Sequence, residues 1–330
     1  MISAYTTEQG KLRALADPIG ECALALWIDL KAPTPEEEVA LDKAFGLDIP
    51  TREEMEEIEV SSRLYLESGA AYATALVLSR TDTDAATVSP VTFILSDRRF
   101  ITVRYEDPRA FSVFAARGAK SGIGGDSPDL ALAGVLEAIV ERLADVLERT
   151  TREIDAISRR IFQAPGRKPT RTDDFQKVLV ELGRKGDFAS NIRDSLVTLS
   201  RAVGFMIFYA DQRAKEDRDL KCDKEFKARL KSVSRDLSSL TDHVTFVADK
   251  ITFLLDATLG MVNIEQNQII KIFSIAAAAF LPPTLIASVY GMNFEHMPEL
   301  KEPLAYPIVV GLMILSAVMP LSWFKKKGWW

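Results

Sequence analysis

Two apolar runs near the end of the chain constrain its fold more than any other feature. The first run, 272–290, holds 19 residues without a charge, and the second, 308–324, holds 17. A helix of 19 residues is about 28 Å long, close to the roughly 30 Å hydrocarbon core of a bilayer. Buried helices of a soluble protein are the alternative for either run alone. Two runs joined by a short polar segment predict a membrane hairpin.

The residues that flank the second run predict its orientation. Trp323 precedes the basic, aromatic end KKKGWW, 325–330. Lysines are enriched on the cytoplasmic side of membrane spans, and tryptophan favours the interface. We therefore expect a cytoplasmic C-terminus. Two spans return the chain to its starting side, so the large N-terminal region is expected in the cytoplasm and the loop between the spans outside.

The rest of the composition excludes several classes of protein. The net charge of −6 argues against nucleic acid as a main partner. Cys22 and Cys222 lie far apart without a CxxC pattern, which predicts inert thiols in a reducing compartment. With only His243 and His296, a histidine-rich metal centre is excluded. No nucleotide-binding or hydrolase motif occurs, so we expect neither an enzyme nor an organic cofactor. The first residues hold no apolar segment, and we expect no cleaved signal peptide.

Three long helices are predicted before the first apolar run. One covers 128–162, with Ser127 as N-cap and Pro128 in the first turn. The second runs from about 173 to 218, and the third from about 220 toward 272 without a proline. We expect the third to continue into the membrane. The apolar residues of this third helix are predicted to form coiled-coil contacts between copies of the chain.

Short β-rich segments before residue 120 predict an α+β head. We expect strands at 23–30, 71–78, 91–95 and 100–105, and helices at 35–45 and 109–117. The acidic stretch 51–60 is interpreted as a solvated helix face. The predicted parts are a cytoplasmic head, 1–126, a helical stalk, 127–271, and a transmembrane hairpin, 272–330.

A polar and apolar stripe marks one face of the first span. Two helices cannot enclose a pore, so conduction requires a ring of copies, each contributing one helix. The first span carries Ser274, Thr284 and Ser288, whereas the second is nearly all aliphatic. Helical spacing predicts one pore-lining face made of Asn267, Ile270, Phe273, Ala277, Leu281, Thr284 and Ser288. A helix–helix packing stripe is the alternative.

The loop after the first span starts with YGMNFEHMPEL, 290–300. Glu295 and Glu299 give it an acidic rim that would concentrate cations at a pore mouth. A Gly-Met-Asn motif at the outer end of the first of two C-terminal spans resembles the CorA family of magnesium transporters. The segments NIEQNQIIKIFS and FLPPTLIASVYGMNF are similar to its proteobacterial branch, and the strong resemblance covers about 240–330.

The resemblance implies a homopentameric funnel in the bacterial inner membrane, in contact with membrane lipid. It implies potential-driven uptake of Mg²⁺, and also passage of Co²⁺ and Ni²⁺. Gly291, Met292 and Asn293 would form the selectivity filter, and the stripe would face the pore. Mg²⁺ dehydrates reluctantly, and a ring of amide oxygens can accept hydrogen bonds from its waters without stripping them. Gly291 is expected to turn the chain with a positive φ.

The resemblance also implies closure by cytoplasmic Mg²⁺ bound between neighbouring subunits. Asp82 and Asp84 lie near the family's position on the head, and Asp236 and Asp242 are the candidates on the stalk, where the aligned position carries Ser239. Mg²⁺ would then be both substrate and regulator. Two alternatives remain: a zinc transporter of the same architecture, and a non-conducting sensor or scaffold anchored in the membrane.

Overall fold

We describe the fold from a computed structural model of the chain. It describes residues 1–57, 59–81, 86–121, 125–162, 172–216, 222–293, 297–298 and 302–329. The chain divides into two compact units. One comprises Met1–Pro165 and Val180–Leu254, and the other comprises Gly166–Leu179 and Leu255–Trp330.

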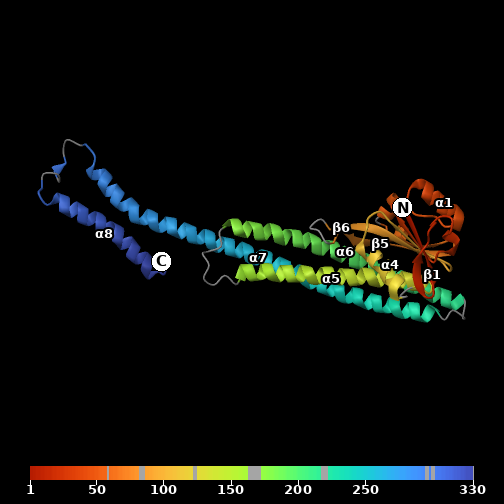
Figure 1. Ribbon diagram of the computed structural model, residues 1–330. Helices are drawn as coiled ribbons and strands as arrows, with labels where there is room; N and C mark the ends of the chain where they lie inside the picture. Colours follow the sequence, from red (N-terminus) through yellow and green to blue (C-terminus); the bar gives the residue numbers. More distant parts are fainter. Residues whose placement is uncertain are drawn as a thin grey trace. The chain divides into compact units, whose positions relative to one another are not determined.

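The first unit contains a seven-stranded sheet with the order β2-β1-β3-β7-β6-β5-β4 (Figure 1). Only the β3–β7 pair is parallel, and the other neighbours are antiparallel. The bounds of the strands are β1 Ile2–Glu8, β2 Lys11–Ala14, β3 Trp27–Lys31, β4 Leu64–Glu67, β5 Ala70–Ser79, β6 Thr87–Leu95 and β7 Phe100–Arg104.

Both faces of this sheet are covered. On one face, Ile28, Leu30 and Ile101 pack in a core with Leu41 and Met55 of α1 (Pro35–Phe45) and α2 (Arg52–Glu56). On the other, Trp27 lies edge-on to Phe114 of α4 (Arg109–Ser121), with ring centroids 5.3 Å apart. Alternating side chains of a strand point to opposite faces, so two covered faces make these strands apolar throughout. The order of strands and helices confirms the predicted α+β head.

An ion pair is buried on the α4 side of the sheet. Arg104 donates to Asp29 at 2.8 Å, and both side chains are 7% exposed. Arg104 also donates to Asp107 at 2.7 Å and lies over the Phe111 ring. Burial alone would lower the pKa of Arg104, but the bonds and charges of Asp29 and Asp107 raise it. The parallel β3–β7 pair is thereby fixed by side chains as well as by its backbone ladder.

Several parts of the head differ from the sequence prediction, among them strand β4, which was not predicted. The β1–β2 hairpin was missed; its turn uses Gln9 and Gly10, both with positive φ, which the right-handed twist of a two-residue hairpin favours. The strand predicted at 23–30 begins later, at Trp27. Cys22–Leu24 forms a 3₁₀ turn closed by the amide of Ala25 on the carbonyl of Cys22. A short helix α3, Val60–Arg63, was also not predicted.

Of the acidic stretch 51–60, residues Arg52–Glu56 form α2, with a solvated face as expected. Glu54 caps the helix through Thr51, and Met55 is buried while the neighbouring glutamates are exposed. The helix predicted at 35–45 is confirmed with the same first and last residues. The helix predicted at 109–117 starts as predicted but extends to Ser121.

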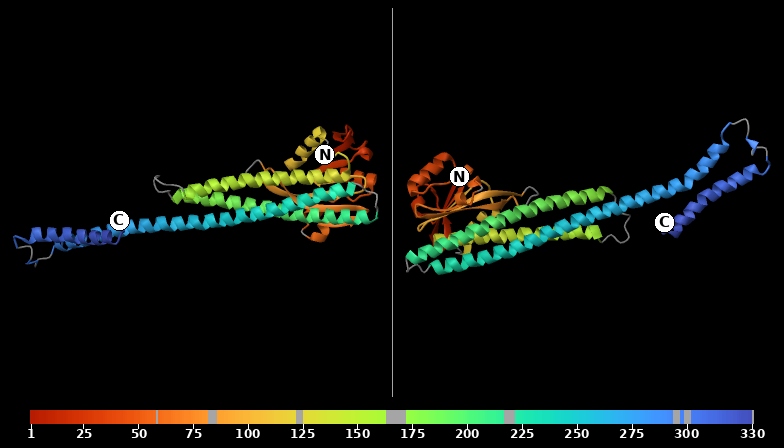
Figure 2. Two further views of the ribbon diagram at one scale, coloured as in Figure 1. Left: turned by 90° about the horizontal axis from the view of Figure 1, so that it is seen from below. Right: turned by 180° about the vertical axis from the view of Figure 1, so that it is seen from behind.

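Three long helices follow the sheet: α5 Pro128–Phe162, α6 Thr172–Glu216 and α7 Cys222–Tyr290. The bounds of α5 match the prediction, and Ser127 accepts a hydrogen bond from the Leu130 amide as its N-cap. In the first unit the three helices lie side by side (Figures 1 and 2). Arg229 of α7 pairs with Glu137 of α5 at 2.6 Å, and Lys185 of α6 pairs with Glu153 of α5 at 2.5 Å.

The apolar stripe of α7 is used inside the chain. Its buried residues recur at steps of three, four and once seven positions, a heptad pattern: Phe226, Leu230, Val233, Leu237, Val244, Val247, Ile251 and Leu254. Phe253 stacks on Phe162 of α5, and a Cβ on Gly186 of α6 would touch Ile251 at 3.9 Å. The expected coiled-coil use of this stripe between copies is therefore wrong, because α5 and α6 of the same chain bury it.

Helix α6 also completes the hydrogen bonding of the sheet. Leu76 of β5 is opposite Pro90 of β6. Proline has no N–H, which fits a pair that is not hydrogen-bonded. In such a pair the N–H and C=O of Leu76 point away from β6. Strand β4 pairs with β5 only as far as Ala73. Beyond it, Ser195 of α6 donates to the Leu76 carbonyl at 2.7 Å, and the Leu76 amide donates to Thr198 at 2.9 Å.

We predict that Ser195→Ala lowers stability by about 1–3 kcal/mol, since it leaves the partly buried Leu76 carbonyl without its donor. Ser195 is completely buried. The measurement is the thermal unfolding midpoint of the full chain in detergent, with Ser200→Ala on the exposed side of α6 as the matched control. Equal midpoints for the two variants would contradict the prediction.

The second unit contains the C-terminal part of α7 and helix α8, Ala305–Lys326. Both helices are long and apolar enough to cross a membrane, judged by length and composition. Helix α8 runs back along α7 (Figure 1). Lys271 Nζ lies 5.7 Å from the ring centroid of Trp329, which brings the end of the chain beside the start of the first apolar run.

Candidate functional site

The C-terminal part of α7 has two different faces. One is partly buried and includes Ile275, Ala276, Ala279, Pro282, Pro283 and Ile286. Helix α8 has a matching, partly buried row that recurs every three or four residues and includes Val309, Met313, Ser316 and Pro320. Complementary half-buried rows on antiparallel helices indicate that these are their mutual contact faces.

The predicted pore stripe lies on the opposite face of α7. All seven of its residues are exposed: Asn267, Ile270, Phe273, Ala277, Leu281, Thr284 and Ser288. Phe273 and Leu281 are 71% and 67% exposed. Helix α8 therefore leaves the stripe uncovered. Packing against α8, one form of the helix-packing alternative, does not account for these residues.

The stripe is polar at both ends and apolar in its middle. Thr284 donates to the Phe280 carbonyl at 2.6 Å. The hydroxyl proton of Thr284 is used in this bond, so the hydroxyl oxygen can only accept further hydrogen bonds. The waters of a hydrated cation are hydrogen-bond donors, so this geometry suits them. Pro282 and Pro283 lie inside α7 and lack the N–H groups of a regular turn, and α7 curves in its last part (Figure 2).

The Gly-Met-Asn segment follows α7 directly. The amide of Gly291 donates to the Ala287 carbonyl at 2.9 Å, and that of Met292 donates to the Val289 carbonyl at 3.3 Å. Gly291, Met292 and Asn293 are all exposed. The helix therefore ends at the start of the motif and presents the Asn293 side chain to solvent.

The expected positive φ at Gly291 is wrong, because this residue is absent from the positive-φ glycines of the described chain. Space explains the glycine instead. A Cβ there would lie 3.0 Å from the Ala287 carbonyl oxygen and 3.6 Å from that of Ser288. A side chain at this position would therefore be in tight contact with the backbone of the last turn of α7.

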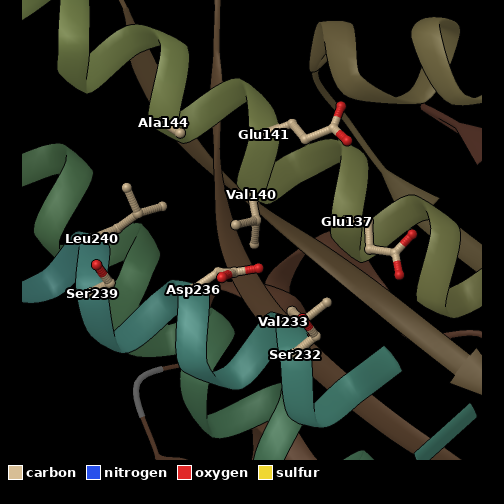
Figure 3. Close-up of a pocket in the computed structure, with 9 residues that line it drawn as sticks. All are labelled: Glu137, Val140, Glu141, Ala144, Ser232, Val233, Asp236, Ser239 and Leu240. Atoms are coloured by element: carbon tan, nitrogen blue, oxygen red, sulfur yellow. The ribbon is translucent and has the colours of Figure 1, made fainter. Parts of the chain in front are cut away.

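A groove of about 440 Å³ opens between α5 and α7 in the first unit (Figure 3). Asp236 of α7 points toward α5, and Glu137 and Glu141 project from α5 beside it (Figure 3). Ser239, which the resemblance implied as the aligned stalk position, lines the same groove. Sequence reasoning missed the two glutamates; their i, i+4 spacing on the predicted helix was the available signal.

The groove does not form a cation site within one chain. Glu137 pairs with Arg229, and Glu141 pairs with Arg117. Among the described residues there is no group of three or more carboxylates, histidines or cysteines arranged to hold a metal ion. Asp242 is exposed and lies six positions from Asp236, so the two point in different directions from α7. The described residues therefore do not fit a regulatory metal held by a single copy.

The other predicted acidic residues, Asp82, Asp84, Glu295 and Glu299, lie outside the described residues. Thr81, directly before Asp82, is buried. Arg142 of α5 donates to its hydroxyl at 2.6 Å, and Arg149 donates to its carbonyl. Two arginines that the sequence analysis did not single out thus anchor the start of this segment to α5.

Comparison with known proteins gives one family over nearly the whole chain. A family model described as CorA-like Mg²⁺ transporter protein matches residues 24–326. The chain is 32% identical over 330 residues to the magnesium transport protein CorA of Mannheimia succiniciproducens, and 32% identical over 331 residues to that of Escherichia coli K12. Both alignments cover 100% of the two proteins.

Solved structures share the fold. The complete CorA magnesium transporter from Methanocaldococcus jannaschii matches with a TM-score of 0.75 at 18% identity, over 100% of this chain and 99% of that one. The cytoplasmic domain of ZntB from Vibrio parahaemolyticus matches with a TM-score of 0.55 at 9% identity, over 79% and 97%. On the family match and the full-length identity, this chain belongs to the family of CorA-like Mg²⁺ transporter proteins.

Proposed function

We propose that this protein is a homopentameric channel that admits Mg²⁺ through the bacterial inner membrane. The observation that carries the proposal is the exposed stripe of α7, which lies opposite the α8 contact face and leads to Asn293. The polar side chains of this face, Asn267, Thr284 and Ser288, are poorly suited to lipid, and copies of the same helix would enclose them. One α7 from each copy around a central axis covers the stripe and makes it the lining of a pore.

The proposed orientation places both termini in the cytoplasm and the Gly-Met-Asn segment outside. The lysines 325–327 at the end of α8 support it. An inside-negative potential then drives inward flow, because moving a divalent cation across 100 mV releases roughly 4.6 kcal/mol. Glu295 and Glu299 in the outer loop would raise the cation concentration at the mouth.

The proposed filter recognises Mg²⁺ through its bound waters. Five Asn293 amides around the axis would accept hydrogen bonds from the waters of Mg²⁺ and leave the shell in place. Co²⁺ and Ni²⁺ form hydrated dications of similar charge, so their passage is part of the proposal. Below the filter, Phe273, Ala277 and Leu281 would form an apolar constriction that closes by excluding water.

The experiment is ion flux into proteoliposomes that contain the purified protein and a Mg²⁺-sensitive dye. An imposed inside-negative potential should drive Mg²⁺ entry, and dissipating the potential should remove it. Zinc entry under a proton gradient without Mg²⁺ entry would instead indicate a zinc transporter. No flux of any divalent cation would indicate a non-conducting sensor or scaffold.

We further propose that cytoplasmic Mg²⁺ slows this flux through carboxylates of neighbouring copies. Asp82 and Asp84 of one copy would face Asp236 and Asp242 of the next. The groove beside Asp236 supports a contribution from a second chain, because two of its three carboxylates are already paired with arginines.

Replacing Asp82, Asp84, Asp236 and Asp242 together by alanine is expected to raise the half-inhibitory internal Mg²⁺ concentration roughly tenfold or more, since a lost charge-assisted contact costs about 1.5–3 kcal/mol. The measurement is the initial dye response at stepped internal Mg²⁺. Asp187→Ala with Asp194→Ala, two exposed aspartates of α6, is the matched control. Unchanged inhibition in the fourfold variant would rule out these four residues as the regulatory ligands.

A further inference from the structure

Helix α7 has a second face before its membrane-spanning part, and this face is exposed. Two rows of residues run along it, each with a step of seven positions. One row is Asp242, Asp249 and Asp256, and the other is Phe246, Phe253 and Gly260. All six are exposed, and Phe246 and Phe253 are 61% and 60% exposed. The buried stripe that packs on α5 and α6 occupies the opposite side of the helix.

The chain itself does not cover these rows. Within the described ranges the three aspartates form no ion pair, and the neighbouring cation, Lys250, is paired with Asp155 of α5. Phe253 stacks on Phe162 of α5 with ring centroids 6.0 Å apart, but Phe162 is itself 48% exposed. The two rings therefore present one aromatic surface to the outside of the helix pair.

Both rows continue into the membrane-spanning part of the same helix. Further steps of seven reach Ile270, Ala277 and Thr284 in one row, and Asn267, Leu281 and Ser288 in the other. These are all the residues of the pore stripe except Phe273. Every residue on the two rows, from 242 to 288, is exposed. Apolar or polar rows that repeat every seven residues are typical of helices that wind around a common axis.

We propose that the α7 helices of neighbouring copies also pack against one another in the stalk, through Phe246, Phe253 and the aspartate row between them. The inference rests on the ring of copies proposed above. If each copy turns its pore stripe toward a central axis, the seven-residue repeat turns Phe253 and Phe246 toward the same axis.

The unbroken repeat selects a second copy of this chain as the occupant. A different protein of suitable charge could cover an acidic and aromatic face, but it would not require rows that continue into the membrane. Only the same helix in another copy has its own rows at the same levels along the whole length.

The energetics favour contact at the phenylalanine levels. Packing the exposed rings of Phe246 and Phe253 together removes apolar surface from water. Aspartates of neighbouring copies at one level repel one another, but salt screens exposed charges over about 10 Å at 0.1 M. Salt does not weaken the burial of the phenyl rings, so the aromatic levels are expected to hold the stalk together and the aspartate levels to remain hydrated.

The experiment is disulfide cross-linking of the full chain in proteoliposomes. Cys22→Ser and Cys222→Ser first remove both native thiols. Phe246→Cys, Phe253→Cys or Leu281→Cys is then introduced singly, and an oxidation catalyst is added. A disulfide forms only where two Cβ atoms come within about 4.5 Å of one another. Gel electrophoresis without reductant measures the fraction of covalent dimer.

We expect each of these three variants to form roughly tenfold more dimer than Phe208→Cys. Phe208 of α6 is 52% exposed, so the control replaces the same type of side chain at a similar exposure. The mass of each assembly before oxidation should equal that of the cysteine-free protein, which separates a change of contact from misfolding.

The outcomes distinguish this inference from the proposed pore. Dimers of Leu281→Cys without dimers of either phenylalanine variant would keep the ring in the membrane and refute its extension into the stalk. Dimers of Phe246→Cys and Phe253→Cys without dimers of Leu281→Cys would support the stalk contact and refute the pore lining. Dimers in none of the variants would refute both. Equal dimer formation by Phe208→Cys would indicate random collision and overturn the inference.

Discussion

Asn293→Ala is expected to reduce potential-driven Mg²⁺ uptake roughly 100-fold or more and to leave assembly intact. The change removes one amide oxygen per copy at a position that is exposed directly after α7. In a ring, each lost hydrogen bond to the hydrated ion contributes about 0.5–1.5 kcal/mol, and the five losses act on the same ion. The dye response in proteoliposomes measures the loss, and the mass of the purified assembly confirms the oligomer.

A second substitution separates the amide from simple bulk. Asn293→Asp keeps the size but places a carboxylate ring at the mouth, which would hold a divalent cation more tightly and release it more slowly. We expect a lower half-saturating Mg²⁺ concentration together with a lower maximal rate. Gln268→Ala removes an exposed amide from the opposite side of α7 and is the control. Uptake by an Asn293→Ala assembly at the unmodified rate would refute the filter.

Phe273→Ser is expected to raise Mg²⁺ flux at inhibitory internal Mg²⁺ by roughly tenfold or more. The proposed constriction closes because water leaves an apolar ring, and a hydroxyl ring lowers the cost of keeping it wet. Phe273 is 71% exposed on the uncovered face of α7, so its replacement removes no packing within the chain. The measurement is the residual dye response under conditions that close the unmodified channel.

The neighbouring residue provides a matched control for this prediction. Ile272 is 66% exposed, close to the value for Phe273, but one step along a helix turns its side chain away from the stripe. Ile272→Ser should therefore leave the closed state closed. A leak of the same size in both variants would mean that a polar group anywhere in the span disturbs the helix, and the gate would lose its support.

The position of the candidate site was available from the sequence. Uncharged runs of spanning length, lysines at the end of the second run and the Gly-Met-Asn motif are all local features. They place the motif and the stripe without any knowledge of long-range contacts. The structure adds that the stripe is the face α8 leaves free. That fact depends on how α7 packs against α8. Helical periodicity alone could not distinguish a face that α8 leaves free from one that packs against α8.

Local signals also decided much of the helical fold. The N-cap at Ser127 and the capping box at Thr34 mark their helices because the capping bonds involve residues within one turn. The hairpin of β1 and β2 was missed even though its turn is local, since Gln-Gly is a weaker turn signal than Asn-Gly or Asp-Gly.

Tertiary structure alone decided what each buried face meets. The heptad stripe of α7 predicts burial equally well against another copy or against the same chain, and only α5 and α6 show that it is the latter. In the sequence Ser195 is an ordinary helix residue. Its role as a donor to Leu76 follows only from the sheet register, which places Leu76 opposite Pro90 and beyond the end of β4. The sequence indicated that Gly291 has a structural role at the end of α7, but only the structure showed that the role is close approach to the Ala287 carbonyl and not a positive φ. Periodicity and composition specify which groups avoid water, whereas the partner of each group depends on contacts between segments far apart in the chain.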